Sequence, residues 1–281
     1  MELKTIGLTK KFSSKTAVDN LNITLTNGVY GLLGANGAGK TTLMRLLCNI
    51  QNPTSGRILL NEKNIVGLGE RYRNLLGYLP QHFGYYPDFS AYDFLRYVSA
   101  LKGLDEKAAH KKSKELLEAV DLSRESKHKI KTFSGGMKQR LGFAQAMLND
   151  PHILILDEPA AGLDPVAREE MADMLLDFVS DENHTVFVSS HIITDLEKIC
   201  DYITFIDKGK ILLSGEKDEI KDNYAIVKGD LSLIDPDKII SKHITDYSSR
   251  ALVYKDDLPK GENFTVEKPT LEDIMVFYVR R

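Results

Sequence analysis

Cysteine and long apolar runs are both scarce in this chain. Its 281 residues include two cysteines, Cys48 and Cys200, which follow no metal-ligand spacing. We therefore expect neither a disulfide framework nor a cysteine-based zinc site. The longest apolar stretches, such as residues 153–156, have the length of a strand. None of them approaches the roughly 18–20 residues that a membrane-spanning helix needs.

The chain also lacks an excess of charge of either sign. Lys and Arg number 37 and Asp and Glu number 40, which gives a formal net charge of −3 at pH 7. This balance argues against a protein that coats nucleic acid or an anionic membrane, but leaves room for a local basic patch. Residues 1–6 lack the charged start and apolar core of a signal peptide, so we expect a cytoplasmic protein.

Apolar patterning predicts an α/β fold. Leu3, Ile6 and Leu8, and then residues 21–25, alternate with polar residues as in half-buried strands. Continuous apolar runs predict strands that are buried on both faces and belong to a largely parallel sheet. These runs are residues 29–33, 153–156 and 185–188, with a helical stretch over residues 168–179 between the last two.

Two regions differ from this α/β pattern. Residues of about 82–150 have a helical period and predict an insert of three helices: one from Ser90 with an apolar face of Phe94, Leu95, Val98 and Leu101, then residues 105–120 and 137–148. Past Gly215, short β-like runs at 225–227, 252–254 and 264–266 precede a helix over 271–279. We predict one domain over residues 1–221 and a small α+β domain over 222–281.

A glycine-rich turn between a buried strand and a helix predicts a phosphate-binding loop. Residues 34–41 fit the pattern G-x-x-x-x-G-K-[ST], and the helix that follows has an apolar stripe of Leu43, Leu46, Leu47 and Ile50. Glycines let backbone N–H groups surround a phosphate chain, and the helix N-terminus adds partial positive charge. Lys40 would reach the β- and γ-phosphates, and the Thr41 hydroxyl would bind Mg²⁺.

Two further segments are candidate parts of the same phosphate-binding site. A buried strand ends in Asp157 and Glu158, a pair that suits a magnesium ion and an attacking water. Ser134-Gly135-Gly136 lies directly before a helix and forms a second candidate anion site with a hydroxyl donor. Each segment is weak evidence alone, because acidic strand ends and serine N-caps are common, but together they favour a nucleotide site.

With these segments the sequence resembles the ATP-binding subunits of ABC transporters, whose signature is Leu-Ser-Gly-Gly-Gln before such a helix. Here Phe133 and Met137 replace the Leu and the Gln of that signature, while the Ser-Gly-Gly centre is intact. Other landmarks follow over about residues 1–220: Gln81 matches the Q-loop, residues 161–164 the D-loop and His191 the switch histidine. Phe12 stands where the family has an aromatic residue that stacks on adenine, although a plain core Phe competes with this reading.

The resemblance implies a fold and a set of roles. The fold is a P-loop NTPase core with a mostly parallel sheet, an N-terminal antiparallel β subdomain, a helical insert and a small C-terminal α+β appendage. The catalytic residues would be Glu158, His191 and Gln81, and the Mg²⁺ ligands Thr41, Gln81 and Asp157. Residues that bind ATP would be Phe12, Gly34, Ala35, Asn36, Gly37, Ala38, Gly39, Lys40, Thr41, Thr42, Ser134, Gly135, Gly136 and Asp164.

The resemblance also implies an activity and partners. Two cassettes would close around two ATP molecules, hydrolyse them with Mg²⁺ and move a separate membrane subunit, from the inner face of the cell membrane. The chain is similar to bacterial exporter cassettes for antibiotic peptides, lantibiotics or sodium. The resemblance implies neither a nucleic-acid partner nor a covalent cofactor. An importer cassette, a soluble ABC ATPase acting on ribosomes or DNA, and an ATP sensor without turnover remain alternatives.

Aromatic residues are concentrated after Gln81 and predict a contact with the membrane subunit. We expect Phe94 and Tyr97 in the core of the helical insert, and several of the loop residues Phe83, Tyr85, Tyr86 and Phe89 to be exposed. Replacing Tyr85 and Tyr86 with Ala would then weaken assembly. The alternative is that the whole group is core packing.

Overall fold

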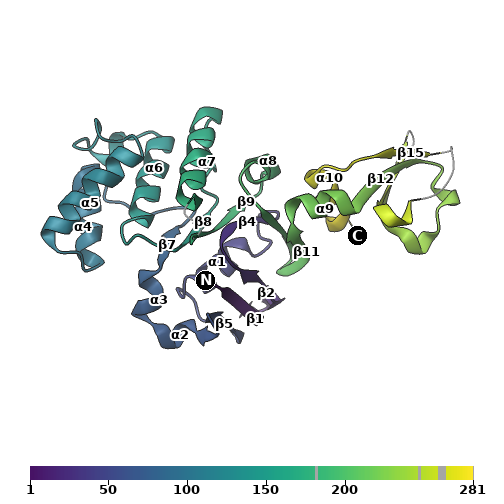
Figure 1. Cartoon of the computed structure of the whole chain (residues 1–281), viewed down its shortest axis with the longest axis horizontal. Coiled ribbons are helices and arrows are strands. Elements are labelled where there is room, and N and C mark those ends of the chain that lie inside the picture. The colour runs from purple at the N-terminus through teal and green to yellow at the C-terminus, as the bar shows by residue number, and fades with distance from the viewer. Residues whose placement is uncertain (181–182, 246–247, 259–263, 281) are drawn as a thin grey trace.

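A mostly parallel sheet forms the centre of the molecule (Figure 1). The computed structural model describes residues 1–180, 183–245, 248–258 and 264–280. Within these residues the strand order is β11-β10-β4-β9-β8-β7. All neighbours are parallel except β10 and β11, which confirms the predicted sheet. Its strands are β4 (Gly28–Leu33), β7 (Leu76–Leu79), β8 (Ile153–Asp157), β9 (Thr185–Ser190), β10 (Tyr202–Asp207) and β11 (Lys210–Glu216).

The sheet separates two apolar cores because its side chains alternate. In β4, Val29 and Leu33 face one core, and Tyr30 and Leu32 face the other. Helices α6 to α8 cover the first face, and α1 with the N-terminal strands covers the second (Figure 1). These helices are α1 (Lys40–Leu47), α6 (Gly135–Ala146), α7 (Pro165–Val179) and α8 (Ile193–Glu197).

The N-terminal strands form an antiparallel sheet of order β2-β1-β5-β6, with β3 beside β1. The single strand expected over residues 21–25 is wrong, because the chain breaks between β2 and β3. At the break, Thr5 Oγ1 donates to Leu21 O (3.0 Å) and accepts from Ile23 N (2.9 Å), so a side chain takes part in the pairing. The strands are β1 (Leu3–Phe12), β2 (Lys15–Leu21), β3 (Thr24–Leu25), β5 (Ser55–Leu60) and β6 (Lys63–Asn64).

The helical insert has the three expected helices. Two predicted apolar faces, one in the insert and one on α1, each include a residue that is exposed. Leu101 lies at the end of α4 and is 70% exposed, and Ile50 lies beyond the end of α1 and is 59% exposed. Ile50 leaves the stripe because α1 stops at Leu47 and Asn49 turns to a φ of 55°. The helices of the insert are α4 (Ala91–Leu101), α5 (Glu106–Ala119) and α6, with a 3₁₀ turn at Ile130–Thr132. Two short helices, α2 (Ile65–Leu68) and α3 (Glu70–Asn74), precede the insert.

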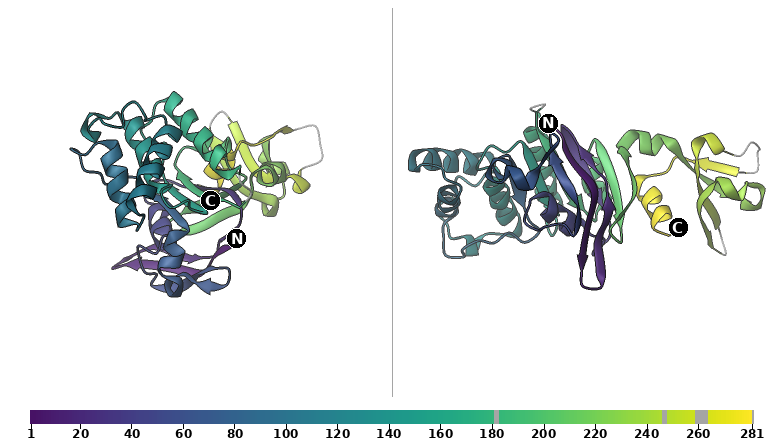
Figure 2. Two further views of the ribbon diagram at one scale, coloured as in Figure 1. Left: turned by 60° about the vertical axis from the view of Figure 1, so that its left-hand side comes forward. Right: turned by 90° about the horizontal axis from the view of Figure 1, so that it is seen from below.

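The C-terminal part is a four-stranded antiparallel sheet of order β13-β14-β12-β15, packed on α10. Figure 2 shows that it projects to one side of the central sheet. Ile274 and Phe277 of α10 join the same core as Leu196 of α8. The predicted boundary after residue 221 falls inside α9 (Lys217–Asn223) and stays a prediction. The other elements are β12 (Tyr224–Gly229), β13 (Ile239–Thr245), β14 (Ser248–Tyr254), β15 (Phe264–Glu267) and α10 (Leu271–Val279).

Helix length and polarity also bear on membrane insertion. Among the described residues, each helix is too short or too polar to span a bilayer.

Candidate nucleotide site

The glycine-rich turn leaves the carboxyl end of β4 and leads into α1, as the motif predicts. Two of its glycines have no room for a side chain. A Cβ on Gly34 would lie 2.4 Å from Ile206 O, and one on Gly39, whose φ is 116°, would lie 2.3 Å from Ala17 O. The loop is therefore held by strands β2 and β10 in a shape that only glycine allows at these positions.

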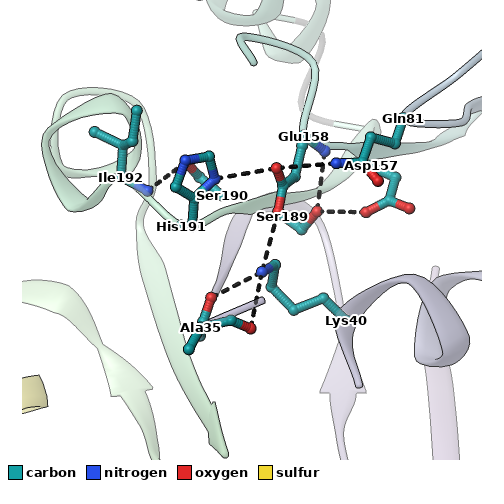
Figure 3. Close-up of polar contacts among 10 residues, drawn as sticks. Ala35, Lys40, Gln81, Asp157, Glu158, Ser189, Ser190, His191 and Ile192 are labelled. Atoms are coloured by element: carbon teal, nitrogen blue, oxygen red, sulfur yellow. Dashed lines mark hydrogen bonds and ion pairs between the residues drawn. The ribbon is translucent and has the colours of Figure 1, made fainter. Parts of the chain in front are cut away.

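Lys40 is buried at the start of α1, and its ammonium turns back over the loop (Figure 3). Nζ donates to Gly34 O (2.7 Å) and Ala35 O (3.4 Å), and lies 3.1 Å from Glu158 Oε1. The cation of the phosphate loop and the acid after β8 thus meet at one point.

The two acids are buried at the end of β8 and share one hydroxyl group. Ser189 Oγ donates to Asp157 Oδ1 (2.8 Å) and accepts from Glu158 N (3.0 Å). Glu158 has a φ of 51°, an uncommon value for a residue other than glycine, and its bond to Ser189 helps to hold it there. Sequence reasoning assigned no role to Ser189. The parallel register of β8 and β9 pairs Asp157 with Ser189, and neither segment alone indicates this register.

Three donors from distant parts of the chain converge on the Glu158 carboxylate (Figure 3). Besides Lys40, Gln81 Nε2 donates to Oε2 (3.3 Å) and His191 Nδ1 lies 3.0 Å from the same oxygen. The donors come from the start of α1, the segment after β7 and the segment after β9. The fold thus gathers Lys40, Gln81, Asp157, Glu158 and His191 into one cluster, which we call the Glu158 cluster.

Other sequence-predicted residues lie outside the Glu158 cluster. Ser134 is exposed at the start of α6, and its Oγ accepts from Met137 N (3.2 Å). Asp164 is exposed and caps α7 by accepting from Val166 N and Ala167 N. Among the described residues, no hydrogen bond joins Ser134 or Asp164 to the Glu158 carboxylate.

The remaining predicted nucleotide contacts surround the phosphate loop. Phe12 ends β1, is 44% exposed, and has Lys10 Nζ 5.1 Å from its ring centroid. Its neighbour strand β2 contains Ala17, whose carbonyl touches the loop at Gly39. The exposed ring agrees with the predicted stacking on adenine, which stays a prediction. Thr41 and Thr42 are half-buried, and Ala35, Asn36 and Gly37 form the exposed tip of the loop.

The residues present fit a hydrated magnesium ion. Asp157 Oδ2 is buried and has no hydrogen-bond partner among the described residues, so an acceptor remains available at the site. Within the same residues, no group of three or more His, Cys, Asp or Glu side chains could hold a metal alone. Magnesium commonly takes one or two carboxylates and completes its shell with water and substrate phosphates. Asp157, Thr41 and Gln81 are a donor set of this kind.

Two titratable groups near Asp157, Tyr78 and Cys48, stay neutral. Burial, with the nearby Cys48 and Asp157, raises the pKa of Tyr78 to about 12. Burial and Asp157 likewise raise the pKa of the Cys48 thiol. At neutral pH neither group competes with Asp157 as an anion.

The aromatic segment after Gln81 differs from its prediction in two ways. Among the four loop residues only Tyr86 is mainly on the surface, with 49% exposure, since Phe83, Tyr85 and Phe89 are partly buried against the core. Tyr97, expected in the core, is 39% exposed, while Phe94 is buried as expected. Tyr97 lies off the buried face of α4 and meets the rings of Tyr86 (5.4 Å) and Phe89 (5.8 Å). We call these three residues the aromatic patch.

Comparison with known proteins gives the family of this chain. Residues 18–161 match the ABC transporter family. The bacitracin transport ATP-binding protein BcrA of Bacillus licheniformis is 39% identical over 220 residues, which are 78% of this chain and 71% of the relative. The lantibiotic transport ATP-binding protein SrtF of Streptococcus pyogenes is 38% identical over 217 residues, covering 77% and 91%.

A solved structure agrees with these relatives. The ATP-binding subunit of an ABC transporter superposes with a TM-score of 0.70 at 26% identity, covering 79% of this chain and 92% of that one. Together with the phosphate loop and the Glu158 cluster, these likenesses show that the chain belongs to the ATP-binding subunits of ABC transporters and is an ATPase.

Proposed function

We propose that this chain powers an exporter by ATP-driven closure of two cassettes beneath a separate membrane subunit. The observation that carries the proposal is the Glu158 cluster, in which a buried carboxylate meets Lys40, Gln81 and His191. A protein that only senses ATP does not need a carboxylate placed between the phosphate cation and a histidine. A relative named as a Nod factor export ATP-binding protein, 36% identical over 207 residues, supports efflux as the direction of transport.

Within the cluster, Glu158 has the chemistry of a general base. A water oxygen attacks the γ-phosphorus, the bond from that phosphorus to the bridging oxygen breaks, and the carboxylate takes a proton of the water. His191 would hold the water and the γ-phosphate in line. Lys40 neutralises the charge that develops on the phosphate oxygens. Incoming phosphates therefore compete with Glu158 for the Lys40 ammonium, which frees the carboxylate for the water.

Magnesium would be held by Thr41, Gln81 and Asp157, directly or through water. When bound, the ion neutralises phosphate charge as a Lewis acid. Ser189 keeps one oxygen of Asp157 occupied and leaves the other free, which fixes the orientation of the carboxylate.

The second half of each site would come from another copy of the chain. Ser134, Gly135 and Gly136 lie at the exposed N-terminus of α6, and a Cβ on Gly135 would meet open space. Backbone N–H groups at such a terminus bind anions. We assign these residues, with Asp164, to the γ-phosphate of the ATP held by the partner cassette. Phe12 would stack on the adenine of the ATP held by its own chain.

The membrane subunit would bind at the aromatic patch, on the helical insert. Tyr86, Phe89 and Tyr97 present a contiguous apolar surface beside the loop that carries Gln81. Exposed aromatic clusters of this kind are typical of protein interfaces. This assembly would hold the chain at the inner face of the cell membrane.

The test is turnover of ATP by the complex of this chain with its membrane subunit. Glu158→Gln keeps the size of the side chain but removes its charge, so we expect turnover to fall by about 10²–10⁴-fold. ATP binding should persist, because the loop amides and Lys40 are unchanged. Lys40→Ala should instead abolish most ATP binding. Wild-type turnover in the Glu158→Gln complex would contradict the assignment of the base.

A further inference from the structure

Helix α8 sets the position of His191, and it is a short element. It begins two residues after His191 and spans Ile193–Glu197. Its apolar residues Ile193 and Leu196 enter the core. Its charged residues reach other helices, with Glu197 bound to Lys221 of α9 (2.6 Å) and Lys198, just after it, paired with Glu169 of α7. Side-chain bridges therefore hold the solvent side of α8.

A cleft separates α8 from α7. Its volume is about 900 Å³ when the part open to solvent is included, and its lining includes Glu158, His191, Met171 and Leu175. The apolar residues of both helices enter one core below the cleft, and side-chain bridges across the cleft add a second link between the two helices.

Arg168 of α7 makes one such bridge, and it also reaches a third segment. Its Nη1 lies 3.5 Å from Asp195 Oδ1 on α8, and its Nε donates to Leu163 O (3.2 Å). Leu163 directly precedes Asp164, which we assign to the partner's nucleotide. One planar guanidinium thus connects the 163–164 turn to the helix that follows His191.

The acceptor on α8 is withdrawn from water. Asp195 has a half-buried side chain, and burial raises its pKa above the ordinary value despite the opposing charges of Arg168 and His191. Water solvates a half-buried carboxylate poorly, so its charged form relies on nearby cations more than the charged form of an exposed carboxylate does. The Glu169–Lys198 pair spans the same two helices, but both of its side chains are about 60% exposed.

We propose that Arg168 is a positioning residue, which keeps His191 against Glu158 by joining α8 to the 163–164 turn. The inference rests on the roles proposed above for Glu158 and His191. In the closed pair of cassettes the 163–164 turn would face the partner chain, so movement of that turn would reach His191 through Arg168. The residue would thereby make turnover depend on closure.

The experiment measures kcat and KM for ATP in the full complex with variants on both sides of the bridge. We expect Arg168→Gln and Asp195→Asn each to lower kcat by roughly 10- to 100-fold, the range for misplacing a catalytic group by about 1 Å. KM for ATP should change by less than about twofold, because the phosphate loop is untouched. The double variant should be no slower than the slower single variant. Glu169→Gln, which removes the neighbouring exposed bridge, is the matched control and should keep wild-type turnover.

A His191→Ala background distinguishes positioning from general destabilisation. If Arg168 acts through His191, adding Arg168→Gln to His191→Ala should lower kcat by less than about twofold more. The inference would be overturned if Arg168→Gln lowered kcat as strongly in the His191→Ala background as it does in the wild-type protein. Equal losses of kcat in Arg168→Gln and Glu169→Gln would overturn it as well. Wild-type turnover in His191→Ala alone would instead contradict the proposed role of His191. Asp195→Asn gives the same test if Arg168→Gln does not fold.

Discussion

At the scale of single residues, the site depends on a hydroxyl that carries no chemistry itself. Ser189 binds the side chain of Asp157 and the backbone of Glu158, so it fixes both acids at once. Glu158 also has a left-handed backbone, which costs energy for a residue other than glycine. Without the Ser189 acceptor, the buried N–H of Glu158 would lose its partner and the carboxylate would be free to shift.

We therefore expect Ser189→Ala to lower kcat by roughly tenfold, since small displacements of a catalytic group are costly. ATP binding should be nearly unchanged. The matched control is Thr204→Val on β10, which removes a buried strand hydroxyl that bonds to Ser214 instead of to the site. Steady-state turnover and ATP titration of both variants check this. Equal losses in the two would show that Ser189 matters only for folding.

At the scale of elements, the sequence predicted the extents of helices better than the burial of the residues at their ends. The helices expected from Ser90, over residues 105–120 and over 271–279 are present, and Ser90, Asp105 and Thr270 cap them. Such starts are legible in a sequence because an N-cap bond joins residues only three apart. The positions of Ile50 and Leu101 were wrong. A helical period says which residues share a face, but where that face stops being covered depends on distant parts of the chain.

The same distinction applies to the site. Lys40, Glu158 and His191 were found because each lies in a local motif with an expected neighbour. Ser189 and Arg168 act through contacts that join segments distant in the sequence, and a single sequence does not display such contacts. Tyr97 was misplaced for a different reason: it lies off the buried face of α4, where its ring meets Tyr86 and Phe89 and stays partly exposed.

The aromatic patch provides a prediction about the helical insert. We expect Tyr86→Ala combined with Tyr97→Ala to reduce capture of the membrane subunit at least about tenfold, the loss typical of an interface hot spot. ATP binding by the isolated chain should persist. Tyr254→Ala, which removes an exposed tyrosine of the C-terminal sheet, is the control and should assemble normally. Pull-down with the co-expressed membrane subunit measures this, and normal capture of the double variant would exclude the patch as the socket.

The start of α10 gives a prediction that depends on pH. Asp273 Oδ2 accepts from Thr270 N (3.1 Å) and Oγ1 (2.7 Å), and Oδ1 accepts from Arg250 Nη2 (3.0 Å). Burial raises the pKa of Asp273, but these bonds outweigh it and bring the value below the ordinary 3.8. A carboxyl whose pKa is lower in the folded protein stabilises it above the unfolded pKa, and this contribution is lost as pH falls.

Asp273→Asn should therefore lower the opening free energy of α10 by about 0.3–1 kcal/mol at pH 7, the usual contribution of a negative charge in the first turn of a helix. The difference from wild type should shrink as the pH approaches 3.8 and falls below it. Hydrogen exchange of the α10 amides measures this at both ends of the range. Glu272→Gln makes the same change of charge in the same helical turn, and we expect a smaller effect from it. A pH-independent difference would contradict the assigned role of the carboxylate.

At the scale of the whole molecule, one chain carries the two halves of the proposed ATP site at separate places. Lys40, Asp157 and Glu158 are buried at the ends of the central strands, with Gln81 and His191 exposed beside them. Ser134 and Asp164 are also exposed, and their side chains cap the starts of their own helices. An exposed phosphate-binding helix start and a phosphate loop with its catalytic acid complete each other when two copies meet. ATP then acts as the contact between them.

The resulting prediction is that Glu158→Gln forms a stable dimer with Mg-ATP. Because the variant cannot hydrolyse ATP, the γ-phosphate stays between the chains, and a ligand that binds the dimer better than the monomer shifts the equilibrium by mass action. Wild-type protein should be mainly monomeric under the same conditions, because it converts ATP to ADP.

Adding Ser134→Arg should abolish the dimer, since a bulky side chain at the start of α6 blocks the anion site. That change also removes an N-cap worth about 1 kcal/mol, so thermal unfolding must show that the variant is folded. Gel filtration with Mg-ATP and with Mg-ADP distinguishes the states, and a Glu158→Gln dimer that is equally stable with ADP would argue against the γ-phosphate as the link.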